Sequence, residues 1–128
     1  MDPSAWRWTR LGEAHPEVLR FVGLQLGELP VVSFFRSEVS WYLFTSRRVL
    51  GRFSGQAVEV AALDVVSDSF GNFKGYGGRE TGVMTLQLSD GVEVSLEYET
   101  FKASMAPIYY MMYWKHKYPI LDKLKAEP

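Results

Sequence analysis

Apolar and polar residues alternate with a period of two over most of the chain between residues 31 and 98. This period places successive side chains on opposite faces of a strand, and the segments are rich in the β-branched and aromatic residues that strands favour. The pattern predicts a mainly antiparallel curved sheet or barrel of about seven strands. We expect these strands near residues 31–35, 38–45, 48–54, 56–60, 64–70, 81–88 and 92–98.

The last two predicted strands define their own register. A two-residue turn would pair Leu88 with Glu93 and would set an apolar face against a charged one. A three-residue loop at 89–91 pairs Leu88 with Val92 and keeps the apolar residues of both strands on one face. The sequence therefore predicts this loop, with Gly91 in the left-handed conformation. The residues that we expect in the core are Leu86, Leu88, Val94 and Leu96.

Residues 13–26 have the pattern of an amphipathic helix, preceded by an irregular segment. Pro16 suits a first helical turn, Glu17 complements the positive end of the helix dipole, and Gly27 is a natural stop. The apolar stripe consists of Val18, Leu19, Val22 and Leu26. We therefore expect an N-terminal packing helix, and an α+β fold overall.

A second helix is predicted over residues 99–117, followed by a short coda at 119–126. Its sheet-facing stripe is Phe101, Met105, Ile108 and Met112. Three large rings then fall on the opposite face, and a helix that is apolar all round is normally covered all round. The cover is either the N-terminal segment or another protein, since aromatic residues are enriched at interfaces. The candidate contact residues are Tyr110, Tyr113, Trp114, Trp6 and Trp8.

Composition excludes several classes of function. The 128 residues include 14 basic and 15 acidic side chains, and the basic ones are dispersed, which does not favour nucleic acid as a partner. The absence of cysteine excludes disulfides and thiolate chemistry. No stretch approaches the ~20 apolar residues of a membrane span, and the first ten residues lack a signal-peptide core. We expect a single cytoplasmic domain over residues 1–128.

No residue pattern predicts catalysis, a metal or a cofactor. The two histidines, His15 and His116, each lie at the margin of a predicted helix without a neighbouring acid or hydroxyl at a telling spacing. No strand-Ser-helix elbow of the GxSxG type is present. Glu93 and Glu97 share the polar face of a strand, where solvation is the simpler explanation. The sequence thus favours binding over chemistry.

Two basic segments are candidate anion or ligand contacts. The glycine-rich segment 71–79 contains Lys74 and Arg79, and its glycines would let backbone N–H groups approach a phosphate. It matches no phosphate-binding motif and is equally read as a flexible hairpin loop. The second segment is a predicted turn whose arginines suit a small anion, although a solvated turn is the alternative. These arginines are Arg47, Arg48 and Arg52.

The predicted order of elements, seven strands followed by an amphipathic helix, resembles that of bacterial pleckstrin-homology (PH)-like domains. The stretch at 41–50, WYLFTSRRVL, also resembles a hairpin of these domains. The resemblance covers roughly residues 31–117. It implies binding of lipids, peptides or proteins without catalysis. Members that bind phosphoinositides resemble one another in carrying several basic residues around the first hairpin, where this chain has only Arg36. We therefore do not expect a membrane-lipid ligand.

Three functions remain open from the sequence. The first is a non-catalytic interaction module that binds a protein or peptide, or a second copy of itself. The second is a small-molecule-binding or enzymatic pocket on a curved antiparallel sheet, which a cavity with convergent polar groups would favour. The third is a toxin inhibitor of the immunity type, which is a special case of the first.

Overall fold

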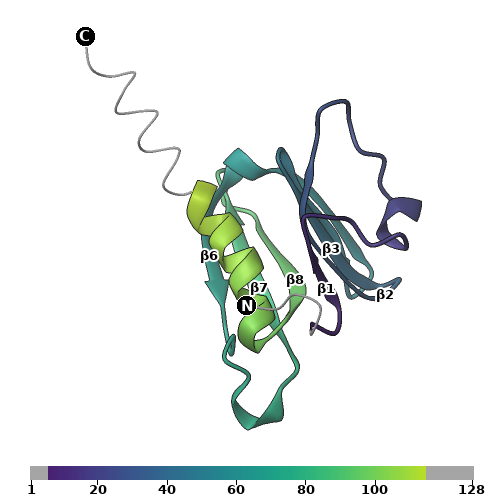
Figure 1. The fold of residues 1–128 in the computed structure, drawn as a ribbon. Helices are drawn as coiled ribbons and strands as arrows, with labels where there is room; N and C mark the ends of the chain where they lie inside the picture. Colours follow the sequence, from purple (N-terminus) through teal and green to yellow (C-terminus); the bar gives the residue numbers. More distant parts are fainter. Residues whose placement is uncertain (1–5, 115–128) are drawn as a thin grey trace.

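The computed structural model describes residues 6–114, which form two antiparallel sheets and a C-terminal helix (Figure 1). The first sheet has the order β1-β2-β3-β4-β5, and the second has the order β6-β7-β8. The mainly antiparallel prediction is confirmed, but the described strands form two separate sheets and not a closed barrel. The strands are β1 (Thr9–Leu11), β2 (Pro30–Ser37), β3 (Ser40–Thr45), β4 (Arg48–Phe53), β5 (Gln56–Ala61), β6 (Val65–Phe70), β7 (Thr81–Leu88) and β8 (Glu93–Glu99).

The core lies between the two sheets, where β8 of the second sheet contacts β3 and β4 of the first. Alternating residues of β2, β3, β7 and β8 are fully buried there, and they include Phe34, Tyr42, Phe44, Met84, Leu86, Leu96 and Tyr98. Close approach of the sheets requires a glycine on β4. A Cβ atom at Gly51 would lie 2.6 Å from the Cδ2 atom of Leu96 on β8.

The β7–β8 hairpin has the predicted register. The Leu88 amide donates to the carbonyl of Val92 at 2.9 Å, and the Gly91 amide donates to the carbonyl of Leu88 at 2.9 Å. Gly91 is left-handed, with φ of 87°. Of the residues expected in the core, Leu86 and Leu96 are fully buried, whereas Leu88 and Val94 are half-buried at its margin.

The predicted helix at 13–26 is absent, and that prediction is wrong. This segment is an irregular loop with one 3-10 turn, η2 (Val18–Arg20). Val18 and Val22 are buried against Trp41, Leu43 and Leu50 on the outer face of the first sheet. Leu26, which the helical stripe required to be buried, is 98% exposed.

Part of this loop's backbone forms hydrogen bonds with a side chain of the first sheet and not with a helical turn of its own. The His15 amide donates to Oγ of Ser33 at 3.0 Å, and that hydroxyl donates to the carbonyl of Glu13 at 2.9 Å. The loop covers the face of β3 that points away from the second sheet. All six residues of β3 are therefore buried.

The C-terminal helix is present, but its predicted rotation is wrong. A 3-10 turn, η5 (Phe101–Ser104), leads into the α-helix at 105–114. Phe101 and Met112, expected to face the sheet, are 65% and 43% exposed, whereas Tyr110 is buried with its ring centroid 4.9 Å from that of Phe44 on β3. Phe101 has a left-handed φ of 64°. The chain therefore bends at the first residue of the predicted apolar stripe, and the helix that follows is rotated relative to the prediction.

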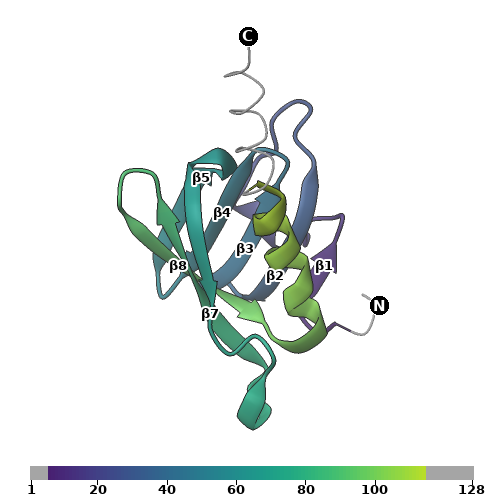
Figure 2. The same ribbon diagram turned by 90° about the vertical axis from the view of Figure 1, so that its left-hand side faces the viewer.

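The helix lies beside the first sheet, at the side where β1 and β2 are found (Figure 2). Residues 115–117 of the predicted helix, and the predicted coda at 119–126, lie outside the described residues. No helix within 6–114 is long and apolar enough to cross a bilayer. Besides η2 and η5, the described residues contain two further 3-10 turns, η3 (Ala62–Asp64) and η4 (Tyr76–Gly78).

Candidate functional site

The edge strand β1 is anchored by a single carboxylate from the other sheet. Glu99, the last residue of β8, accepts hydrogen bonds from the amides of Arg7 and Trp8 at 2.8 and 2.9 Å. It also accepts one from the Thr9 hydroxyl at 2.7 Å. The chain segment that leads into β1 is therefore tied to the end of β8 in the other sheet.

One edge of β1 is without a neighbouring strand among the described residues. The amide of Phe35 donates to the carbonyl of Trp8, and the amide of Gly12 donates to the carbonyl of Val31. In an antiparallel pair, residues that bond to the partner strand alternate with residues whose backbone groups point away. The backbone groups of Thr9 and Leu11 therefore point to the free edge of β1.

An apolar groove separates β1 and β2 from the C-terminal helix. Its volume is about 550 Å³. Three of its lining side chains are largely exposed, namely Leu11 at 50%, Tyr109 at 58% and Tyr113 at 55%. Its lining residues are Trp6, Leu11, Val31, Ser46, Ala106, Tyr109, Tyr110, Tyr113 and Trp114.

The candidate contact residues from the sequence gather at this groove, although not by the expected geometry. Trp6, Tyr110, Tyr113 and Trp114 all line it. Trp8 does not, because its ring packs edge-on against Phe34, with centroids 6.4 Å apart, and it borders the neighbouring hollows. The N-terminal segment and the helix thus form two walls of one groove, with space between them.

Tyr110 forms a buried, fixed part of the groove wall. Its hydroxyl donates a hydrogen bond to the carbonyl of Thr45 at 2.7 Å. Burial raises the pKa of the Tyr110 phenol, so the group stays neutral and polar contacts are directed into the protein. Tyr110 itself is only 6% exposed, so the accessible tyrosine surface of this wall comes from Tyr109 and Tyr113.

A second hollow follows the residues of β1 itself. It has a volume of about 460 Å³ and is lined by residues 6–11 with Glu13 and His15. The ring of His15 lies 2.6 Å, through Nε2, from the carbonyl oxygen of Trp8. Burial lowers the pKa of His15, which favours the neutral ring with an Nε2 proton donated to that carbonyl. Along β1, Arg10 and Leu11 are exposed, whereas Thr9 is 3% exposed, so only the C-terminal part of the free edge is open to solvent.

A third hollow, of about 620 Å³, is rich in charge. It contains Lys74 and Arg79 of the glycine-rich loop, which the sequence had suggested as ligand contacts, and it adds Arg7 and Lys102. The hollow also contains Trp6, which it shares with the apolar groove. The two are therefore adjacent.

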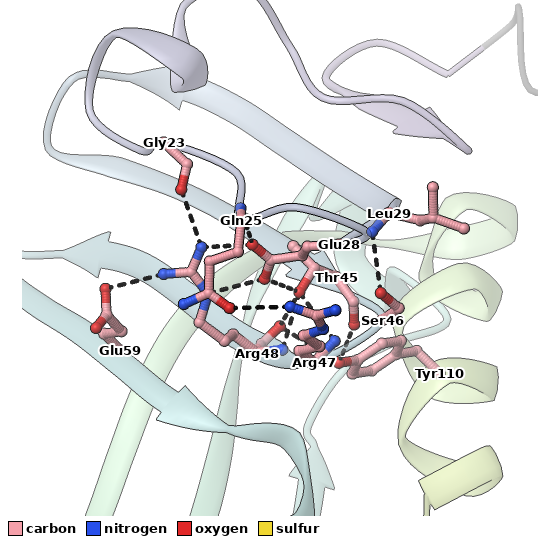
Figure 3. A network of polar contacts seen from close by, with 10 residues as sticks. All are labelled: Gly23, Gln25, Glu28, Leu29, Thr45, Ser46, Arg47, Arg48, Glu59 and Tyr110. Atoms are coloured by element: carbon pink, nitrogen blue, oxygen red, sulfur yellow. Dashed lines mark hydrogen bonds and ion pairs between the residues drawn. The ribbon is translucent and has the colours of Figure 1, made fainter.

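The arginines of the other predicted anion site, Arg47, Arg48 and Arg52, have separate surroundings in the structure. Arg48 holds Glu28 through two hydrogen bonds, from Nη2 to Oε1 at 2.6 Å and from Nε to Oε2 at 2.8 Å (Figure 3). Arg47 reaches Oε1 of Gln25 at 3.3 Å. Arg52 lies on β4 opposite Ala57, away from this network. These three residues do not converge on one anion site.

The Glu28–Arg48 pair is a structural connection between the N-terminal loop and the β3–β4 hairpin. The Glu28 side chain has no exposed surface, and the hydroxyl of Thr45 and the amide of Gln25 also donate to it. Hydrogen bonding from Arg48 is the main reason that the pKa of Glu28 falls to about 2, against the opposing effect of burial. The pair therefore remains ionised throughout the physiological range.

Within residues 6–114, no three acidic or histidine side chains are grouped so that they could hold a metal ion. In comparisons with known proteins, no family model matches this chain. No curated protein and no solved structure matches it either. The functional argument therefore depends on the geometry of the groove and of β1.

Sequence reasoning found the aromatic residues of the groove but missed the strand beside them. β1 has three residues, and its only signal is Thr9–Leu11 between Trp8 and Gly12, which is too short for a periodic pattern. The role of Glu99 was also missed, because its partners lie about ninety residues earlier in the chain. Neither feature follows from local spacing.

Proposed function

We propose that the protein is a non-catalytic interaction module that binds an extended segment of a partner protein. The partner segment pairs with the free edge of β1, and its apolar side chains enter the groove between β1 and the C-terminal helix. The observation that carries the proposal is the open apolar groove directly beside an unpaired strand edge. Strand addition of this kind gives affinity through backbone hydrogen bonds and specificity through side-chain pockets.

The lining of the groove favours a peptide over a small polar substrate. Apart from its aromatic residues, the groove has Ser46 as its one polar lining residue. The hydroxyl of Tyr110 donates to a backbone carbonyl and so points into the protein. Pockets that bind small molecules specifically combine apolar walls with several convergent polar groups. Here the backbone groups that point to the free edge are those of Thr9 and Leu11, and Leu11 is the exposed one of the two.

The order of elements is consistent with the resemblance to PH-like domains. Within residues 31–114, seven strands, β2 to β8, precede the C-terminal helix, and β1 is an addition. We propose on this basis that the chain has a PH-like architecture, and such architectures are associated with binding of peptides or proteins. The proposed binding mode depends on β1 and the helix, and does not require the family assignment.

The test is selection of a phage-displayed library of short random peptides against the full chain. We expect enriched peptides with alternating apolar residues, typical of an added strand. Leu11→Ser and Tyr113→Ser each remove apolar groove surface without adding charge. Each should weaken binding of the selected peptides about tenfold or more, since burying one large apolar side chain contributes about 1.5–3 kcal/mol.

Val66→Ser is the matched control. Val66 is 54% exposed on β6, compared with 50% for Leu11 on β1, and it does not line the groove. Circular dichroism of each variant checks that the fold is retained. Equal losses in the Leu11 and Val66 variants, or peptides that bind all four proteins alike, would refute the proposed site.

A further inference from the structure

We infer that the segment bound at β1 carries acidic residues on the side that reaches Trp6, where the charged hollow would hold them. This inference rests on the proposed function, because it specifies the partner at the same edge. It assigns a binding role to the charged groups of Lys74, Arg79 and Lys102, none of which forms an ion pair among residues 6–114.

The carboxylates of the charged hollow are already engaged by the protein. Glu80 forms a salt bridge with Arg7 at 3.0 Å. Glu99 accepts the amides of Arg7 and Trp8 with its two oxygens. Neither acid therefore needs the remaining cations.

Three cations are left without a carboxylate partner among residues 6–114. Lys74 and Arg79 form no ion pair there, and the contact of Lys102 is with the ring of Phe101, its Nζ lying 5.9 Å from the centroid. All three line the same hollow. Although the chain has a net charge of −1, this hollow therefore attracts negative charge.

The backbone of the hollow is also fixed. The hydroxyl of Thr100 donates to the carbonyl of Arg79 at 2.6 Å, and the amide of Phe101 donates to the carbonyl of Phe73 at 2.6 Å. These bonds tie the glycine-rich loop to the end of β8. The positions from which Lys74, Arg79 and Lys102 extend are thereby held on one rim.

The position of the acidic residues follows from the geometry of β1. Arg7 lies in a bend before β1, so the distance from Arg7 to Leu11 is at most about 13 Å, the length of a chain extended at about 3.3 Å per residue. A partner residue beside Arg7 is therefore at most about four positions from the residue beside Leu11. An acidic residue that precedes the apolar anchor indicates a partner strand parallel to β1, and one that follows it indicates an antiparallel strand.

The same peptide selection tests this inference when it is repeated with Lys74→Glu/Arg79→Glu. Both residues are exposed on a loop, so the fold should be retained. Wild type should enrich peptides with Asp or Glu within about four positions of an apolar anchor. The double variant should lose that preference and bind the selected acidic peptides at least about tenfold more weakly, as reversal of close charge pairs does at protein interfaces.

Arg20→Glu/Arg52→Glu is the control, because it changes the net charge equally at residues that do not line the charged hollow. It should leave binding nearly unchanged. Anisotropy titrations of a selected peptide and its Glu→Gln form should differ, and the difference should shrink at high salt.

The outcomes separate the two proposals. Uncharged peptides that depend on Leu11 but are indifferent to Lys74 and Arg79 would overturn the inference and leave the proposed function intact. Acidic peptides that depend on Lys74 and Arg79 but not on Leu11 or Tyr113 would overturn both the groove and an acidic partner at β1. If no peptide is enriched, both proposals are contradicted.

Discussion

Replacing Arg48 with methionine should strongly destabilise the protein. The substitution leaves the Glu28 carboxylate, which has no exposed side-chain surface, without the two hydrogen bonds at 2.6 and 2.8 Å that neutralise it. Removing one partner of a buried ion pair typically costs about 3–5 kcal/mol. The hydroxyl of Thr45 and the amide of Gln25 remain as donors, so we expect the lower end of this range.

The pKa of Glu28 gives an independent magnitude. A carboxyl group whose pKa falls from 4.5 to about 2 on folding stabilises the folded state by about 3 kcal/mol, at about 1.4 kcal/mol per pH unit. Because the folded-state pKa is the lower one, this stability is fully present above pH 4.5. It should be lost progressively as the pH falls from 4.5 to about 2.

Urea unfolding followed by tryptophan fluorescence, at a series of pH values, measures both effects. The free-energy difference between wild type and Arg48→Met should be about 3 kcal/mol near neutral pH and should shrink at low pH as Glu28 becomes protonated. Glu28→Leu/Arg48→Met should recover much of the loss, since no buried charge remains. A difference below about 1 kcal/mol near neutral pH would refute the reasoning, because it would show the pair to be no stronger than a surface ion pair.

Three smaller changes test the fold. Gly51→Ala should cost about 1–3 kcal/mol in urea unfolding, because the new Cβ would lie 2.6 Å from Leu96, whereas Gly23→Ala, with nothing within 4 Å, should cost much less. Gly91→Val should lower the free energy of thermal unfolding by ~1–2 kcal/mol or more, since its φ is 87°, and an effect of a few tenths would contradict the hairpin geometry. Tyr110→Phe should lower the unfolding free energy by about 1 kcal/mol, through loss of its bond to a backbone carbonyl, and no change would indicate that this bond contributes nothing.

The sequence predicts the strands well because one face of each sheet must be buried. In the β7–β8 hairpin, a shift of one residue would move Leu86 and Leu96 from the core to solvent, so the apolar pattern determines the register. The prediction of an N-terminal helix is wrong because burial of apolar residues alone does not determine the backbone conformation. Val18 and Val22 are four residues apart, as in a helix, yet an irregular loop presents both to the outer face of β3 just as well.

The candidate site was predictable only in part. Aromatic residues mark its walls, so composition pointed to Trp6, Tyr113 and Trp114. The rotation of the helix depends on a left-handed φ at Phe101, a conformation that a bulky residue rarely adopts and that no pattern signals. The convergence of Lys74 with Lys102 depends on how the end of β8 approaches the glycine-rich loop, which is a matter of tertiary contacts.

The double-sided burial of β3 also has a consequence for dynamics. With all six residues covered, by the second sheet on one side and by the N-terminal loop on the other, β3 has no face from which water can approach its amides without wider opening. Its amide protons should therefore exchange with deuterium only when the whole chain unfolds, while those of the edge strand β1 report local opening. The slowest exchange rate of β3 is thus a native-state measure of global stability, against which the faster exchange of the edge strand β1 can be compared.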